Sequence, residues 1–354
     1  MQLFLGTYSV KNQKDLQMIH LSPPIRTNRK SNIELLRIVA MLMILTLHTR
    51  YDGILSVYDG TIDASHIARF FFESISSVGV NLFVFISGYF GIKLRKASVA
   101  NLAFQVYYFA IIAFIGSCLL NGSLHVGSAG YLKLLFPLSH NVWFVPCYFI
   151  LMLLSPILNS FIEGKTAKQL ALYTLGLYAI AFVWTDIWGC VDGFSGYSWG
   201  FFIILYMTGA TIRKWATNHS LRKSYCLLGY IMCSTLTVVL ALVQSRVPFG
   251  QSLIWVYDFP IVYVSSICLF LFFVQLKIGS SKMINAIAAS SFAVLLFHMS
   301  ACSQYKVVCQ YIYEHFDGVV VIVLTACAVV GYYAISMLLD QPRKFFCKFV
   351  KDKI

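Results

Sequence analysis

The chain has 354 residues, of which 59% are hydrophobic and only 12% are charged. Soluble domains average about 45–50% apolar and about 25% charged residues, and the mean hydropathy here is +0.75. This composition excludes a disordered chain, a coiled coil, a disulfide-stapled domain and a cytosolic enzyme. Many apolar runs approach the ~20 residues that a helix needs to cross a bilayer, which is far longer than the alternating strands of a membrane β-barrel.

The apolar runs predict an all-α, polytopic membrane protein with about ten transmembrane helices. The expected spans, in chain order, are 33–49, 70–92, 99–120, 142–162, 170–188, 198–212, 226–243, 257–276, 286–305 and 318–339. An even number of spans places both termini on the same side of the membrane. No linker long enough to separate a second folded domain is visible between these spans.

The positions of the basic residues predict the orientation. Lys and Arg gather in the loops that face the cytoplasm, and cytoplasmic termini place 22 of the 27 Lys and Arg on that side. The outer loops are instead acidic or aromatic, with Asp52, Asp59, Asp63 and Asp192 among them. The net charge of +13 is therefore a sign of topology, and no nucleic-acid partner is expected. We expect a basic cytoplasmic tail at 1–31, a membrane domain at 32–345 and a second basic cytoplasmic tail at 346–354.

The first expected span, SNIELLRIVAMLMILTLHT, carries Glu34, Arg37 and His48. At about 100° per residue, the eleven positions from Arg37 to His48 bring both residues to nearly the same face, about 16 Å apart along the axis. Ionisable groups in a span normally face a bundle interior or a water-filled cavity. The stripe favours a functional role, although an interfacial Glu34–Arg37 pair with His48 at the outer helix end is the simpler alternative.

The second span is also polar. It carries Glu73, Asn81 and Ser87, and its Gly79 and Gly88 are typical of close helix packing. Asn81 fits either a functional role or a bond across the bundle, and Glu73 fits the outer interface. His298 lies well inside the ninth span, where it either takes part in the chemistry or bonds a neighbouring helix. The ten cysteines form no CxxC pair and no Cys/His cluster, so no metal is expected.

Several of these motifs resemble one known family. Glu34-x-x-Arg37 followed by His48, then GVNLFVFISGYF, HNVWFVPCYFILMLLSP, SSFAVLLFHMS and the closing Asp340-Gln-Pro-Arg343 are similar to the membrane acyltransferase family 3. The resemblance covers about residues 32 to 345. Members of that family are ten-helix membrane proteins that O-acylate sugars of bacterial cell-surface glycans.

The resemblance implies a function and its partners. It implies transfer of an acyl group, usually acetyl, from cytoplasmic acyl-CoA to a hydroxyl of a cell-surface or lipid-linked glycan, by a protein of the bacterial inner (plasma) membrane. Acyl-CoA would be a donor substrate, with no cofactor bound permanently, and the bilayer itself is a partner. Roles in the reaction would fall to Arg37 and His48, with Glu34 beside them.

The chain departs from the family pattern at two places. Many members carry an Arg-x-x-Arg pair at the start of the third helix, where this chain has Asn101 and Gln105. The hypothesis for the CoA phosphates is therefore Arg37 together with a basic cluster after the second span, Lys93, Arg95 and Lys96. The alternative is that the basic cluster only fixes the topology. The positions that hold a glutamate in many members hold Tyr148 and Phe149.

Acyl transfer to a hydroxyl makes demands that these residues can meet. A hydroxyl attacks a thioester well only if a positioned base removes its proton, and histidine suits this at neutral pH. His48 is the first candidate and His298 the second. The oxyanion that develops needs hydrogen-bond donors, for which Asn81, Ser87 or Trp143 would qualify if they converge. A transporter or flippase is the alternative function, but the chain lacks the internal repeat that marks many transporters.

Overall fold

The computed structural model describes residues 30–49, 64–121, 142–190, 193–244, 253–300 and 304–351, and all regular structure in these ranges is helical. This confirms the all-α prediction. The acidic residues expected in the outer loops, Asp52, Asp59, Asp63 and Asp192, lie outside the described residues, as does most of the 1–31 tail.

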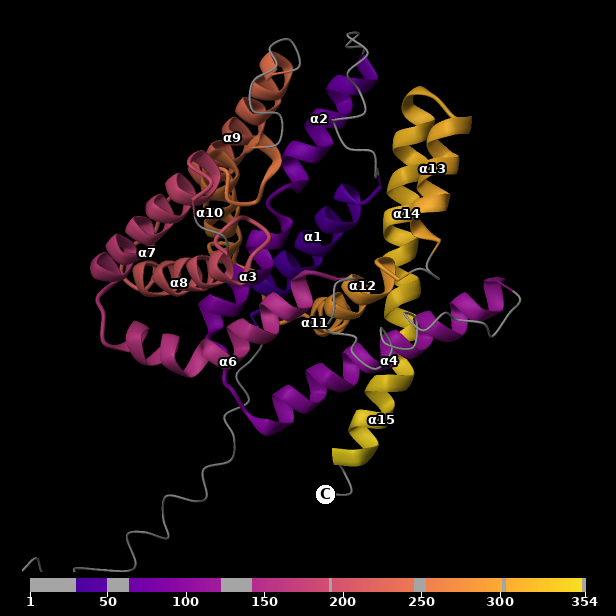
Figure 1. The fold of residues 1–354 in the computed structure, drawn as a ribbon, viewed down its shortest axis with the longest axis horizontal. Coiled ribbons are helices and arrows are strands. Elements are labelled where there is room, and N and C mark those ends of the chain that lie inside the picture. The colour runs from indigo at the N-terminus through magenta and orange to yellow at the C-terminus, as the bar shows by residue number, and fades with distance from the viewer. Residues whose placement is uncertain are drawn as a thin grey trace, which may run out of the picture.

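A helix occupies the place of each of the ten expected spans (Figure 1). The α-helices are α1 (Ser31–Leu47), α2 (Ala64–Ser76), α3 (Gly79–Phe90), α4 (Lys96–Asn121), α6 (Phe144–Glu163), α7 (Ala167–Phe182), α8 (Trp199–Ala216), α9 (Lys223–Gln244), α10 (Pro260–Val274), α11 (Lys282–Ala288), α12 (Ser291–His298), α13 (Tyr305–His315), α14 (Gly318–Leu339) and α15 (Gln341–Lys351). A π-helical turn η2 (Val183–Ile187) extends α7, and a 3₁₀ turn η3 (Leu253–Trp255) precedes α10.

Six helical segments in the described part of the chain are long and apolar enough to cross a membrane. They are Ile67–Phe90, Lys96–Leu120, Phe144–Glu163, Ala167–Ile187, Lys223–Gln244 and Gly318–Lys348. Two further apolar helices, Pro260–Val274 and Lys282–His298, are shorter. The chain is therefore a helical membrane protein with six candidate spans, while the ten-span topology and the cytoplasmic termini stay predictions.

The structure differs from the expected elements at two interruptions. The second span is divided into α2 and α3 at Ser77, whose hydroxyl donates to Ser74 O at 2.9 Å. The ninth is divided into α11 and α12 at Ser290, whose hydroxyl donates to Asp340 Oδ2 at 3.0 Å. Serine hydroxyls compete with the helical hydrogen-bond pattern. Two helices were not predicted as elements, α13 after the ninth span and α15, which runs from the end of the expected membrane domain into the expected C-terminal tail.

The centre of the bundle is the contact between α3 and α8, where two glycines let the backbones touch. A Cβ atom on Gly88 would lie 2.0 Å from Tyr206 O, and one on Gly209 would lie 2.2 Å from Phe85 O. Phe85 and Tyr206 are themselves fully buried. Small residues permit this approach, as the packing interpretation of Gly88 predicts. Around this pair, α1 and α10 pack against α3, and α6 and α7 pack against α8.

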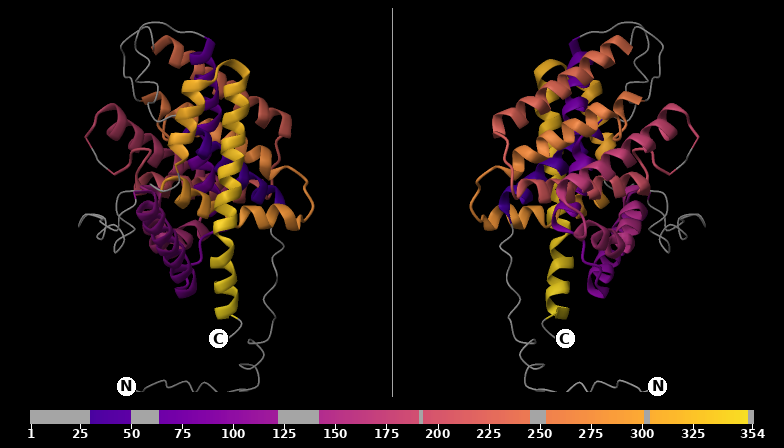
Figure 2. Two further views of the ribbon diagram at one scale, coloured as in Figure 1. Left: turned by 90° about the vertical axis from the view of Figure 1, so that its right-hand side faces the viewer. Right: turned by 90° about the vertical axis from the view of Figure 1, so that its left-hand side faces the viewer.

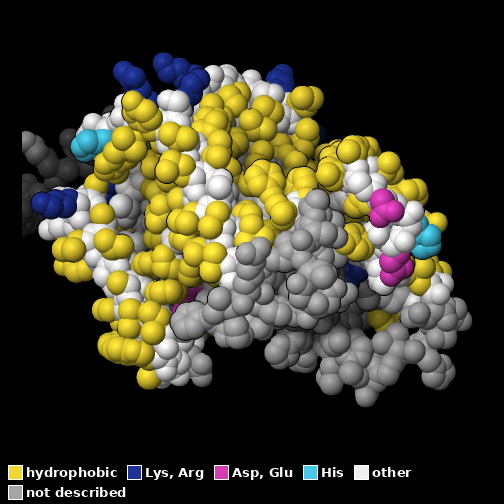
Figure 3. Space-filling model, turned by 90° about the horizontal axis from the view of Figure 1, so that it is seen from above, with side chains coloured by type: hydrophobic (Ala, Val, Ile, Leu, Met, Phe, Trp, Pro, Cys, Tyr) yellow, Lys and Arg dark blue, Asp and Glu magenta, His cyan; other side chains and the backbone are white. Residues whose placement is uncertain are grey.

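The outer helices present apolar surface. Leu119 on α4 and Val319 on α14 are more than 70% exposed. In Figure 3, hydrophobic side chains cover most of the described surface on the face drawn, and Lys and Arg lie mainly along its edge. Such a surface fits contact with lipid rather than water.

A buried charged network joins the end of α14 to the rest of the bundle. Asp340 is fully buried between two cations, with its Oδ1 2.6 Å from Arg343 Nε and its Oδ2 3.4 Å from Lys344 Nζ. Ser290 donates to the same carboxylate, and Arg343 Nη1 lies 3.4 Å from Asn101 Oδ1 on α4. The network therefore ties α14 and α15 to α12 and α4.

Candidate functional site

Two histidines from distant parts of the chain meet inside the bundle. His48 ends α1 as its C-cap residue and His298 is the last residue of α12. Their ring centroids lie 4.9 Å apart at an interplanar angle of 66°. His298 is 3% exposed. The structure thus brings together the first and second histidine candidates, which are 250 residues apart in the sequence.

Main-chain hydrogen bonds orient both rings in the same way. Nδ1 of His48 lies 2.7 Å from Ile44 O, and Nδ1 of His298 lies 2.9 Å from Val294 O. A carbonyl oxygen only accepts, so each Nδ1 carries the proton and donates it. In a neutral imidazole this leaves the lone pair on Nε2. Each ring is therefore held in the tautomer that carries its lone pair on Nε2.

Tyr305 closes one side of the histidine pair and was missed as a site residue by sequence reasoning. Its hydroxyl donates to Leu45 O at 2.9 Å, and its ring centroid lies 6.1 Å from that of His298 in an edge-on arrangement. The side chain is 1% exposed. Tyr305 stood at the end of an expected span, where an aromatic residue is typical of the interface. The signal that could have identified Tyr305 is the helical spacing of Tyr305, Cys309 and Ile312, which are the buried residues of α13.

At the other end of α1, Arg37 has two neighbours of different kinds. Its Nη1 lies 3.7 Å from Oε2 of the buried Glu34, which is a long ion pair. The Arg37 side chain is 29% exposed and also lines a cavity. The sequence left two alternatives for Arg37, a pair with Glu34 or contact with an anionic ligand. In the structure Arg37 pairs with Glu34 and still lines the cavity.

That cavity has a volume of about 320 Å³ and combines cationic, hydroxyl and apolar side chains. Its lining residues are Arg37, Ile86, Ser87, Phe90, Gly91, Ile92, Lys93, Ser98, Leu102, Tyr148 and Met152. Ser87 Oγ and Tyr148 OH lie 3.3 Å apart in its wall, within hydrogen-bonding distance. We call it the Arg37 cavity.

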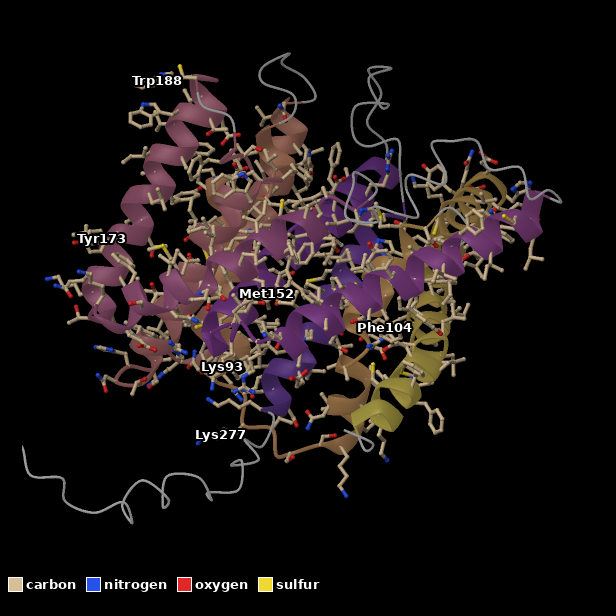
Figure 4. The ribbon with its side chains drawn as sticks, turned by 60° about the horizontal axis from the view of Figure 1, so that its bottom comes forward. Lys93, Phe104, Met152, Tyr173, Trp188 and Lys277 are labelled. Carbon is tan, nitrogen blue, oxygen red and sulfur yellow. The ribbon has the colours of Figure 1, made fainter. Side chains whose placement is uncertain are left out.

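The basic cluster contributes unequally to the Arg37 cavity. All three side chains are exposed, but only Lys93 lines the cavity; Arg95 and Lys96, at the start of α4, are not among the lining residues. In Figure 4, Lys93 lies near the same end of the molecule as Lys277, and Met152 lies farther into the bundle. The cavity therefore combines the two cations expected to meet a donor phosphate, Arg37 and Lys93, with Ser87.

The remaining candidates form a third group. The Trp143 ring lies 5.0 Å from Tyr197 and 5.8 Å from Tyr257 between centroids. Asn81 is fully buried and donates to Tyr257 O at 2.8 Å, and it donates to the Ser266 hydroxyl at 3.0 Å. Glu73 lies half-buried in the last turn of α2. The bonds of Asn81 hold α3 to the start of α10.

The candidates thus fall into three places, and α1 joins two of them. The eleven residues from Arg37 to His48 span about 16 Å along the helix axis. A ligand bound by Arg37 would have to extend along α1 to reach the histidine pair. Among the described residues, no group of three His, Cys, Asp or Glu side chains is placed to hold a metal ion.

The described residues thus form an apolar helical bundle that holds a histidine pair and a cation-lined cavity. Residues 30–340 match the family described as an acyltransferase domain, and the chain belongs to that family. It is therefore a membrane acyltransferase, and a transporter is not favoured. No curated protein and no solved structure matches the chain.

Proposed function

We propose that this protein is an O-acyltransferase that moves an acyl group, most simply acetyl, from cytoplasmic acyl-CoA to a hydroxyl of a cell-surface or lipid-linked glycan. The observation that carries the proposal is the His48–His298 pair, in which the Nδ1 of each ring is engaged by a main-chain carbonyl. The proposed location is the inner (plasma) membrane of a bacterium.

In the proposed reaction, Nε2 of His48 removes the proton from the acceptor hydroxyl as its oxygen attacks the thioester carbonyl. A carbon–oxygen bond forms, the carbon–sulfur bond breaks, and the histidine returns the proton to the CoA sulfur. No net proton is gained or lost. His298, in edge contact with the His48 ring, holds that ring in place.

The Arg37 cavity is the proposed entry for the donor. CoA carries several phosphate charges and cannot cross the bilayer core, so it has to be met by cations at the membrane surface. Arg37 and Lys93 line the cavity together. The pantetheine arm of CoA is a flexible chain that would carry the thioester along α1 towards His48.

The proposal is tested by measuring CoA release from acetyl-CoA by the purified protein, with and without candidate sugars. Release that depends on a sugar, accompanied by O-acetylated product, is the expected result. Longer acyl-CoA species and lipid-linked sugars form the next arms of the same assay. If neither acyl-CoA consumption nor acylated product can be detected with any hydroxyl acceptor, the proposal fails.

A further inference from the structure

The last helix, α15, follows a helix that is long enough to cross a membrane by itself. The 22 residues of α14 are about 33 Å long, which already covers the ~30 Å hydrocarbon core. The combined run Gly318–Lys348 has 31 residues, so its final turns fall within the headgroup layer. Figures 1 and 2 show α15 continuing beyond α14, past α4. It also lies beyond the residues matched by the acyltransferase family, which end at 340.

The composition of α15 is both basic and aromatic. Its sequence, QPRKFFCKFVK, has four cations and no Asp or Glu. Phe345 is 74% exposed and Phe346 is 53% exposed, and Lys348 is exposed as well. At about 100° per residue, Lys344 and Lys348 share one side of the helix, Phe345 lies about 60° from Lys348, and Phe346 lies on the opposite side. An exposed aromatic ring next to exposed lysines is typical of a segment at a lipid–water interface, where the ring meets the acyl chains and the cations meet the headgroups.

The first turn of α15 is anchored to the protein, so its exposed part has a fixed position. Asp340 binds Arg343 and Lys344 and neutralises one of their two charges. The Phe346 ring lies 5.7 Å from Phe104 of α4, between centroids. These contacts hold the helix against α4 and α14, and they leave Phe345 and Lys348 at the surface.

The neighbouring surface identifies the partner. Leu338, in the last turn of α14, is 64% exposed, and Phe345 continues this apolar surface past the buried Asp340. Lipid that covers α14 therefore meets α15 where the lysines begin. The excess of cations favours an anionic partner, and a second copy of α15 would carry the same charges and be repelled.

We propose that α15 is a membrane-surface helix that binds anionic phospholipid headgroups at the end of α14. The Phe345 ring enters the headgroup layer beside the acyl chains, and Lys348 meets a lipid phosphate. This lipid site is independent of the acyl-transfer chemistry.

The test places a reporter at Phe345 of the full-length protein in nanodiscs. The Phe345→Trp variant is compared with the wild type, so that the fluorescence of the six native tryptophans is subtracted. The quencher is brominated phosphatidylglycerol in one series and brominated phosphatidylcholine in the other. We expect the added tryptophan to be quenched by both lipids, and at a lower mole fraction by the anionic lipid.

One variant tests the source of the preference, and two others are its controls. Lys348→Glu is added to the Phe345→Trp protein and changes the charge by two units. At about fivefold per charge, the preference for phosphatidylglycerol should fall by more than tenfold. Lys168→Glu, the same change at an exposed lysine of α7, should leave the preference unchanged. Leu338→Trp, on the lipid-facing surface of α14, should be quenched equally by both lipids.

Each other outcome overturns the proposal. Equal quenching of the position-345 tryptophan by both lipids would mean apolar anchoring without headgroup recognition. No quenching, with an emission maximum typical of water, would mean that α15 extends into solution. No quenching with a blue-shifted maximum that depends on protein concentration would mean that a second copy covers the helix.

Discussion

His48 and His298 are held by one arrangement repeated twice, a terminal helical residue whose Nδ1 bonds the carbonyl four residues earlier. Such a bond fixes the ring orientation as well as the tautomer. The two rings also touch, so a change at either one alters the surroundings of the other. We therefore expect the pair to act as a unit.

Replacing His48 by Ala should lower acyl transfer by about 10²-fold or more, because a general base contributes roughly 10²–10⁴-fold. The measurement is turnover at equal membrane abundance, with correct folding checked by size-exclusion chromatography. His219→Ala is a matched control, because His219 is exposed and stacks on Trp215 outside the site. Activity of His48→Ala within a few-fold of wild type would remove His48 from the reaction.

If the histidines act as a unit, the double variant His48→Ala/His298→Ala should be about as slow as the slower single variant. Residues that act together lose their effects non-additively. Rate losses that simply multiply in the double variant would show that the two histidines act independently.

The Arg37 cavity makes a separate prediction about the donor. The triple Gln variant of the basic cluster (Lys93, Arg95 and Lys96) should raise the KM for acyl-CoA more than the KM for the acceptor. Most of this rise should be reproduced by Lys93→Gln alone, because only Lys93 of the three is among the residues that line the cavity. The wild-type KM for acyl-CoA should also increase with salt, since exposed ionic contacts are screened.

Three lysine and arginine variants distinguish the alternatives. Arg95→Gln with Lys96→Gln is the matched control for Lys93→Gln, since both residues are exposed at the start of α4. An unchanged KM for acyl-CoA in the triple variant would show that the basic cluster serves topology alone. Arg37 would then be the remaining cation of the cavity.

At the scale of elements, two different kinds of contact hold the bundle together. One is close backbone packing at glycines, and the other is a buried network of ion pairs. Gly88 and Gly209 let α3 and α8 touch through their backbones, whereas Asp340 joins α14 and α15 to α12 through ion pairs and a hydrogen bond. Neither contact contains one of the two site histidines or a ligand. The first effect expected of a substitution at either contact is therefore a change in stability.

Gly209→Ala should destabilise the protein by about 1–3 kcal/mol or more, because the new methyl group meets a backbone oxygen that no side-chain rotation can move away. The thermal midpoint of the detergent-purified protein measures the change. Gly176→Ala on α7 is the control, since nothing lies within 4 Å of its Cβ position. That variant should be neutral or slightly stabilised by higher helix propensity.

Asp340→Ala should be more damaging, by about 3–5 kcal/mol, because it leaves the buried Arg343 without its carboxylate. Asp317→Ala removes the same charge at the exposed first residue before α14 and should change the thermal midpoint little. Equal midpoints for the two variants would mean that the Asp340 network contributes nothing to stability.

The helices were predictable because apolar length alone identifies a membrane helix. The interruptions were not predictable, because Ser77 and Ser290 are compatible with a helix interior and their hydroxyls found partners that are distant in the sequence or specific to the local turn. Likewise, His48 could be named as a candidate because it shares a face of the first expected span with Arg37. Its contact with His298 depends instead on how α1 and α12 pack. Nothing in a single sequence reports that packing.

For the whole molecule, the distribution of charge predicts one orientation. Cytoplasmic termini put 22 of the 27 Lys and Arg inside. In a cysteine-substituted protein labelled in intact cells with an impermeant reagent, positions 11 and 348 should stay unlabelled, while positions 59 and 192 should react. The control is labelling after permeabilisation, when all four should react. Labelling of position 348 from outside intact cells would exclude the ten-span topology.

The walls of the Arg37 cavity are held with unequal strength. On one side are Ser87 and Gly91 at the end of α3, whose backbone is locked against α8 at Gly88. On the other side are Ser98 and Leu102 of α4. Only 17% of the most apolar stretch of this helix is buried inside the protein. Because α3 is packed tightly against α8 and α4 is largely in contact with lipid, the Arg37 cavity would widen by movement of α4. The position of α4 would therefore set how large a ligand the Arg37 cavity admits. Because α4 moves against lipid, the stiffness of the surrounding bilayer would affect ligand entry.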